Sequence, residues 1–182
     1  MMITPMLVTE VAWGPELWKT KLSDKVIGEL YNESNKLRKP DVDNKNEWTK
    51  KSSLKFKSTT WIKALIEPYV DKLGDEWHID DAWVNYLTSG MMNPLHNHPP
   101  HDMSFVIYLD VPEELRTEQI QFSSVHPGEP PGSIMFIHNN DRKHICPQTG
   151  DMLIFPSTLL HMVYPFRSNI ERVAIAGNIY YG

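Results

Sequence analysis

From Trp77 onward, short β-prone runs alternate with turn residues, and this alternation constrains the fold more than any other feature. The runs are rich in β-branched and aromatic residues, and several of the turns between them carry proline or glycine. About seven short strands at such spacing are typical of an all-β sandwich or barrel, and we predict a jelly roll with helices packed on one side. The runs are AWVNYL (82–87), MSFVIYLD (103–110), QIQFSS (119–124), SIMFIH (133–138), DMLIFP (151–156), HMVYPF (161–166) and RVAIAGNIYY (172–181).

The first part of the chain has a helical pattern. Ser23 can cap a helix with one apolar face that ends before Pro40. A second helix is predicted over about 60–73, where Pro68 would kink or split it. Residues 41–58 are polar and lysine-rich, which predicts a loop or, within KKSSLKFK, a strand edge guarded by lysines.

Bulk composition limits the class of protein. The length suits one domain over residues 1–182, with a helical flank over about 1–76 and the jelly-roll core over about 77–182. The net charge of −5 does not favour a nucleic-acid partner, and no apolar run is long enough to span a membrane. Cys146 is the single cysteine and no signal-peptide pattern is visible, so we expect a cytoplasmic protein. The sequence does not predict its oligomeric state.

The histidines are unevenly placed, with three in LHNHPPH and one after the run DMLIFPSTLL. His96 and His98 are two residues apart, so on an extended segment they point the same way. His161 can approach them in a folded barrel, and imidazole suits iron, zinc and copper. The three histidines form a candidate metal site. Taken without His161, the pair His96 and His98 fits a polar loop without metal equally well.

Arg172 follows His161 by eleven residues. If a short loop over 167–171 joins their strands as a hairpin, the two side chains can share one cavity. A buried guanidinium needs a carboxylate to compensate its charge. A diacid ligand can supply it, and Glu171 or Asp110 is the alternative within the chain.

Two segments carry a family resemblance: WVNYLTSGMMNPLHNHPPHDMSFVIYLDVP and PQTGDMLIFPSTLLHMVYPFRSNIERVAIAGN. They resemble the 2-oxoglutarate/Fe(II)-dependent oxygenases of bacteria and phages, whose core is similar to that of prolyl 4-hydroxylases. The resemblance is continuous from about Trp83 to Asn178. It implies a double-stranded β-helix and a dioxygenase that uses Fe(II), 2-oxoglutarate and O2, acting as a hydroxylase of a small molecule or peptide.

The resemblance also implies residue roles. His96 and His161 match iron-binding histidines of the family, and no catalytic side chain beyond the metal ligands is implied. Arg172 matches the residue that grips the far carboxylate of 2-oxoglutarate, and Tyr108 matches a tyrosine that donates a hydrogen bond to it. The positions implied to contact the cosubstrate are Arg172, Tyr108, Tyr86 and Asn85.

The second iron ligand departs from the usual pattern. The facial triad of non-haem iron oxygenases has two histidines and one carboxylate, and His98 stands at the carboxylate position. Three neutral imidazoles would leave the iron site one unit more positive. We expect His98 to be the third ligand because the H-x-H spacing fits without a gap, with Asp102 as the alternative.

Two other functions share the strand pattern. GMMNPLHNH has cupin-like spacing, but His161 lies eleven residues past Gly150, where a cupin places its later histidine close to a P-x-G element. A cupin-type metal protein that does not use 2-oxoglutarate is therefore one alternative. A non-catalytic jelly-roll binding module is the other.

Overall fold

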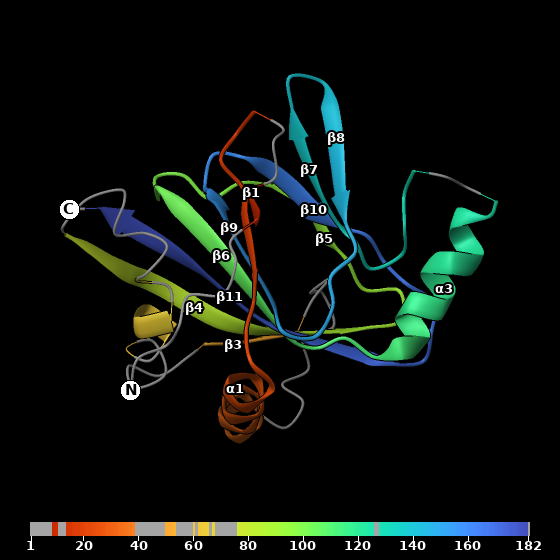
Figure 1. Ribbon diagram of the computed structural model, residues 1–182, viewed down its shortest axis with the longest axis horizontal. Helices are drawn as coiled ribbons and strands as arrows, with labels where there is room; N and C mark the ends of the chain where they lie inside the picture. The colour runs from red at the N-terminus through yellow and green to blue at the C-terminus, as the bar shows by residue number, and fades with distance from the viewer. Residues whose placement is uncertain are drawn as a thin grey trace.

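The computed structural model describes residues 9–10, 14–38, 50–53, 60, 62–65, 67, 76–125 and 128–181. Two antiparallel sheets form a jelly roll (Figure 1). The seven-stranded sheet has the order β1 (Thr9–Glu10), β2 (Trp18–Lys21), β9 (Asp151–Pro156), β6 (Met103–Asp110), β11 (Glu171–Tyr181), β4 (Trp77–Thr88) and β3 (Lys50–Ser53). The four-stranded sheet has the order β5 (Asn93–His96), β10 (Leu160–Val163), β7 (Ile134–His138) and β8 (Asp141–Ile145).

Residues 1–76 were predicted as a helical flank, and their described part contains helices but also strands β1, β2 and β3 of the larger sheet. Helix α1 (Asp24–Leu37) begins at the predicted cap, and the Ser23 hydroxyl accepts a hydrogen bond from Val26 N–H at 3.5 Å. Its apolar face packs Ile27 and Leu30 into the core beside the larger sheet. Within the predicted second helix, residues 60, 62–65 and 67 are helical, and Pro68 lies outside the described residues. No helix of the described ranges is long and apolar enough to cross a bilayer.

One prediction about a single segment was wrong. Residues 119–123 of the run expected as a strand belong to helix α3 (Glu113–Ser123). The buried helix residues Leu115 and Gln119 are one helical turn apart while Ile120 is 65% exposed, so the burial follows a helical period. Residues 50–53 form β3, an edge strand rich in lysine, which is the alternative to a loop that the sequence offered within KKSSLKFK.

The predicted hairpin between His161 and Arg172 is also wrong. Strand β10 pairs with β5 and β7, whereas β11 pairs with β4 and β6 in the other sheet. The connection therefore crosses from one layer to the other. The two side chains still reach one interior, because each sheet turns one face toward it.

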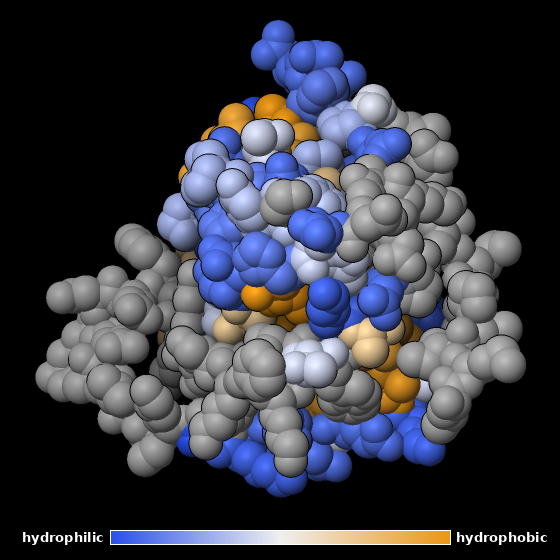
Figure 2. All heavy atoms as spheres, turned by 90° about the vertical axis from the view of Figure 1, so that its left-hand side faces the viewer, coloured by the Kyte–Doolittle hydropathy of each residue, from blue (hydrophilic) through white to orange (hydrophobic). Residues whose placement is uncertain are grey.

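Strand alternation divides the core into two clusters. Along β6, Phe105 and Ile107 belong to the cluster that includes α1, while Val106 and Tyr108 belong to the cluster between the sheets. Figure 2 shows that the described residues on one side of the molecule are mostly hydrophilic, with apolar atoms visible in a hollow near the centre. The cluster between the two sheets, which includes Val106 and Tyr108, contains the candidate site.

Candidate active site

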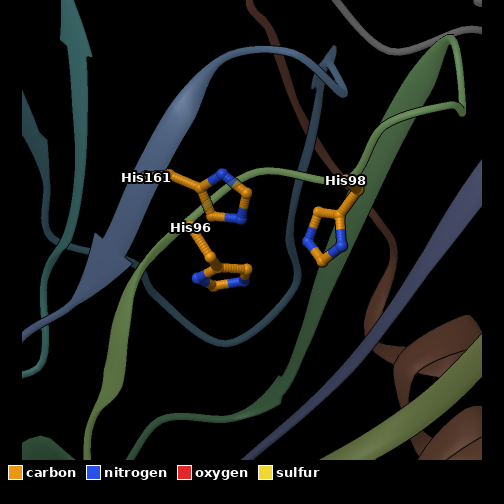
Figure 3. A group of neighbouring side chains, drawn as sticks. All are labelled: His96, His98 and His161. Carbon is orange, nitrogen blue, oxygen red and sulfur yellow. The ribbon is translucent and has the colours of Figure 1, made fainter.

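Three imidazoles converge between the sheets (Figure 3). His96 is the last residue of β5 and is directly paired with His161 of β10, and His98 follows two residues later. One ligand nitrogen from each ring can be chosen so that all three lie within 4.8 Å of one another. The structure therefore brings together the three histidines that the sequence singled out.

Hydrogen bonds orient two of the rings. His161 Nδ1 is 2.9 Å from the Leu159 carbonyl oxygen, and His96 Nδ1 contacts the Pro94 carbonyl oxygen in the same way. A carbonyl only accepts, so each Nδ1 carries the proton and each Nε2 keeps a lone pair for a metal. Burial lowers the pKa of His161 to about 4, which keeps this imidazole neutral at neutral pH.

Arg172 lies on β11 and is 2% exposed. Its Nη1 donates to the Gly132 carbonyl oxygen at 2.7 Å, and its Nε has no hydrogen-bond partner within the described part of the chain. Among the described residues no carboxylate pairs with it: Glu171, one of the two alternatives from the sequence, binds Arg38 instead. Burial lowers the pKa of Arg172. A buried cation with an unpartnered N–H is a position for an anionic ligand.

Gly132 is required at the turn that receives this guanidinium. Its φ is +66°, and an added Cβ would lie 2.8 Å from the Leu115 side chain. Any other residue would be strained at this φ, and the Leu115 side chain would have to shift to make room for its Cβ. The carbonyl that holds Arg172 is thus set by a glycine turn.

Tyr108 stands beside Arg172, with its ring centroid 5.4 Å from the guanidinium carbon. It is 1% exposed, and burial raises its pKa to about 12, so it stays protonated and can donate a hydrogen bond. Asn85 lines the same cavity, and its Oδ1 accepts a hydrogen bond from Trp83 Nε1 at 3.1 Å.

One cavity joins these groups. Its lining includes the three histidines, Arg172, Tyr108 and Asn85, and it contains no carboxylate side chain among the described residues. Ala174 and Ala176 line it between Arg172 and the far end of β11. Inward residues recur about every 6.7 Å along a strand, so these small side chains leave room for a ligand to lie along β11.

Tyr86 is the predicted site residue that the structure does not bring to the cavity. It follows Asn85 on β4 and therefore faces the opposite side of the sheet. There its hydroxyl donates to the Ser34 carbonyl oxygen at 3.0 Å, and Arg38 lies over its ring. Its surroundings are those of a structural residue that attaches α1.

Asp102, the alternative third ligand, is also turned away. Its Oδ2 accepts a hydrogen bond from Tyr181 N–H at 2.8 Å, at the end of β11. It is absent from the group of side chains that can share a metal ion, which contains His98.

Other residues that line the cavity were not identified from the sequence. Trp83 and Ala174 line the cavity, two residues before Asn85 and two after Arg172 respectively. Extending the two-residue period from each predicted site residue would have found both.

The comparisons with known proteins agree with this geometry. The family model described as "Putative 2OG-Fe(II) oxygenase" matches residues 81–178, more than half of the 182-residue chain. The chain belongs to this family. The 2OG-Fe(II) oxygenases use Fe(II), 2-oxoglutarate and O2, so the chain is an Fe(II)/2-oxoglutarate-dependent oxygenase and the predicted cofactors are confirmed.

Solved structures show the same fold. A viral collagen prolyl hydroxylase from Paramecium bursaria Chlorella virus 1, in its 2-oxoglutarate complex, is 15% identical with a TM-score of 0.66, covering 93% of this chain and 97% of that chain. A prolyl 4-hydroxylase from Pseudomonas putida is 12% identical with a TM-score of 0.64, covering 93% and 94%. HygX from Streptomyces hygroscopicus, with nickel and 2-oxoglutarate bound, is 10% identical with a TM-score of 0.64, covering 91% and 82%. No curated protein matches.

These likenesses confirm the predicted double-stranded β-helix. Family membership favours the oxygenase over the cupin-type and non-catalytic alternatives. The residues fit the family's cofactors: the three imidazoles are grouped for a metal, and the unpartnered Nε of Arg172 is placed for an anion.

Proposed function

We propose that this oxygenase hydroxylates a C–H bond of a small molecule or peptide, with His96, His98 and His161 as the iron ligands. Arg172 and Tyr108 hold the far carboxylate of 2-oxoglutarate. One observation carries the proposal: a buried arginine, with no carboxylate partner in the described part of the chain, shares a cavity with three grouped imidazoles. No other ligand class explains both the charge of Arg172 and the histidine group as simply as a metal-chelating diacid.

Each side chain has a separate task. The two Nδ1 hydrogen bonds hold His96 and His161 with Nε2 available to iron. Arg172 pairs with the carboxylate, and Tyr108, protonated because burial raises its pKa, donates to it. Bound iron would supply the redox chemistry with O2 as oxidant: one oxygen atom would go to 2-oxoglutarate, which would become succinate and carbon dioxide, and the other to the hydroxylated substrate.

The cavity also limits the substrate. Because its described lining contains no carboxylate, no lining group pairs with a cationic substrate. The lining residues that are partly exposed, including Trp83, His98 and Ala176, mark the side from which the substrate enters. We infer that an uncharged aliphatic or aromatic group reaches the iron.

Anaerobic titration of the purified chain with Fe(II) and 2-oxoglutarate tests the proposal. We expect the weak visible charge-transfer band of the chelate, and succinate release once O2 is admitted. Arg172→Ala should abolish 2-oxoglutarate binding while Fe(II) still binds. A folded wild-type protein without the band would contradict the proposal, and retained 2-oxoglutarate binding in Arg172→Ala would contradict the assigned role of the arginine.

We also propose a cytoplasmic location. The chain has one cysteine and so forms no internal disulfide, which agrees with a reducing compartment. Fractionation of the native host cells would test it, and recovery of the protein outside the cytoplasm would contradict it.

A further inference from the structure

His98 lies outside the strands that hold the other two histidines. His96 and His161 are paired residues of β5 and β10, so the sheet fixes their backbones. Strand β5 ends at His96, and His98 lies in the segment that leads to β6 at Met103. A third ligand on such a segment needs support of its own if its ring is to stay with the other two.

Backbone hydrogen bonds attach this segment to the turn after β9 and to the end of β11. The His98 N–H donates to the Ser157 carbonyl oxygen at 2.8 Å, and the Ser157 N–H donates to the Asp102 carbonyl oxygen at 2.9 Å. The Asp102 N–H donates to the Ile179 carbonyl oxygen at 3.0 Å. The position of His98 therefore depends on where Ser157 lies.

A buried chain of side chains fixes Ser157. The Ser104 hydroxyl donates to Asn178 Oδ1 at 2.8 Å and lies 2.8 Å from the Ser157 hydroxyl. A hydroxyl has one proton to donate, so Ser157 is the donor to Ser104. Asn178 Nδ2 donates to Asp81 Oδ1 at 2.8 Å, which sets the orientation of the amide because a carboxylate only accepts.

Packing alone does not require these polar residues. Ser104, Ser157 and Asn178 are 2%, 0% and 2% exposed, and burying such groups is unfavourable unless each is satisfied. Neighbouring inward positions on β6 and β11 are apolar, as at Val106 and Ala174. The polar chain occurs where the Ser157 turn meets the segment that carries His98.

We propose that Ser104, Ser157 and Asn178 are positioning residues that hold His98 in the metal site through the Ser157 carbonyl. The inference rests on the proposed function, because it takes His98 as a metal ligand. Removing one hydroxyl lets the Ser157 turn shift and moves His98, while the paired strands keep His96 and His161 in place. The metal site then has two well-placed imidazoles in place of three.

Metal titration under anaerobic conditions tests the inference without a substrate. With Fe(II) and with Co(II) as probes, Ser157→Ala and Ser104→Ala should each weaken metal binding about tenfold or more. The visible spectrum of bound Co(II) should shift toward that of His98→Ala. The matched control is Ser133→Ala: Ser133 is also fully buried, but its hydroxyl has no hydrogen-bond partner among the residues that the structure describes, so wild-type affinity is expected. Thermal unfolding of the metal-free proteins checks that each variant folds.

A double variant separates positioning from general loss of structure. If the serine acts through His98, adding Ser157→Ala to His98→Ala lowers metal affinity no further. Equal losses in the two backgrounds would overturn the inference, as would wild-type metal affinity in both serine variants. If His98→Ala itself binds metal like the wild type, the proposed ligand set is wrong and the inference falls with it.

Discussion

His96 and His161 lie directly opposite one another on β5 and β10, and the centroids of their rings are 4.4 Å apart. Side chains at directly paired positions emerge on the same face of a sheet. The smaller sheet thus presents two imidazoles as a preformed pair, and His98 joins them from the adjoining segment. The third residue decides the charge of the site.

Replacing that residue by a carboxylate should change how strongly the site attracts 2-oxoglutarate. His98→Asp restores the ligand set of two histidines and one carboxylate, so we expect Fe(II) binding to be retained. The site loses one positive charge, and its affinity for the 2-oxoglutarate dianion should fall by roughly three- to tenfold. Anaerobic titration of the iron-loaded proteins with 2-oxoglutarate measures the change. The neutral variant His98→Asn separates charge from side-chain size, and unchanged or tighter binding in His98→Asp would contradict the electrostatic argument.

Arg172 should stabilise the bound cosubstrate without stabilising the metal-free fold. Its charge is buried and lacks a carboxylate among the described residues. Arg172→Met should therefore leave the free energy of unfolding of the metal-free protein unchanged, or raise it by up to about 2 kcal/mol. The 2-oxoglutarate affinity should fall by about 100-fold, because charge-assisted hydrogen bonds are lost. Urea unfolding and 2-oxoglutarate titration measure the two effects.

Arg38→Met is the matched control for this variant. Arg38 pairs with Glu171 near the surface and is absent from the cavity lining, so its removal should leave 2-oxoglutarate affinity unchanged. A loss of more than about 1 kcal/mol of stability in Arg172→Met would show that the hydrogen bond from Arg172 to the Gly132 carbonyl stabilises the fold by more than the buried charge destabilises it.

Removing the hydroxyl group should have different effects at Tyr108 and at Tyr86 in the same two assays. Tyr108→Phe removes a donor beside Arg172 and should weaken 2-oxoglutarate binding roughly tenfold. Tyr86→Phe removes the hydrogen bond to the Ser34 carbonyl and should cost about 1 kcal/mol of unfolding free energy with no change in 2-oxoglutarate affinity. A large effect of Tyr86→Phe on cosubstrate binding would contradict its placement on the far side of β4.

The positions of Tyr86 and Tyr108 show how much of the site could be predicted from the sequence. The strands and the histidine spacing depend on local periodicity, so most strands and the meeting of His96, His98 and His161 followed from the sequence. Tyr86 does not reach the cavity because neighbouring residues of a strand face opposite sides of the sheet, and Asn85 takes the inward face of β4.

Other features depend on contacts far apart in the sequence. The helix over 113–123 was missed because it has few apolar residues. One of its two buried residues is Gln119, whose side-chain amide donates a hydrogen bond to the distant Pro131 carbonyl oxygen. The hydrogen bonds that join Ser104, Ser157 and Asn178 connect three separate elements and have no local pattern. Such contacts cannot be predicted from local sequence patterns, because they form only when the two sheets pack together.

The connection between β10 and β11 is held by a carboxylate whose protonation should weaken it. Glu118 of α3 accepts hydrogen bonds from the backbone N–H groups of Arg167 and Ser168 at 2.8 Å each, and another from the Ser168 hydroxyl. Burial alone would raise the pKa of Glu118, but the hydrogen bonds from Ser168 and Arg167 together lower it below 4.5. Glu118 therefore stabilises the fold fully above about pH 4.5, and this contribution is lost as the pH falls through its lowered pKa.

Glu118→Gln should cost about 1 kcal/mol of unfolding free energy at neutral pH, at the low end for such bonds because solvent reaches the carboxylate. The difference from wild type should shrink as the pH falls through the lowered pKa of Glu118, since the wild-type carboxylate is then protonated as well. Urea unfolding at neutral pH and at a pH below that pKa measures it. Glu114→Gln, at an exposed position on the same helix, should show no such difference at either pH. A gap between Glu118→Gln and wild type that persists at low pH would show that side-chain shape, and not charge, holds the connection between β10 and β11.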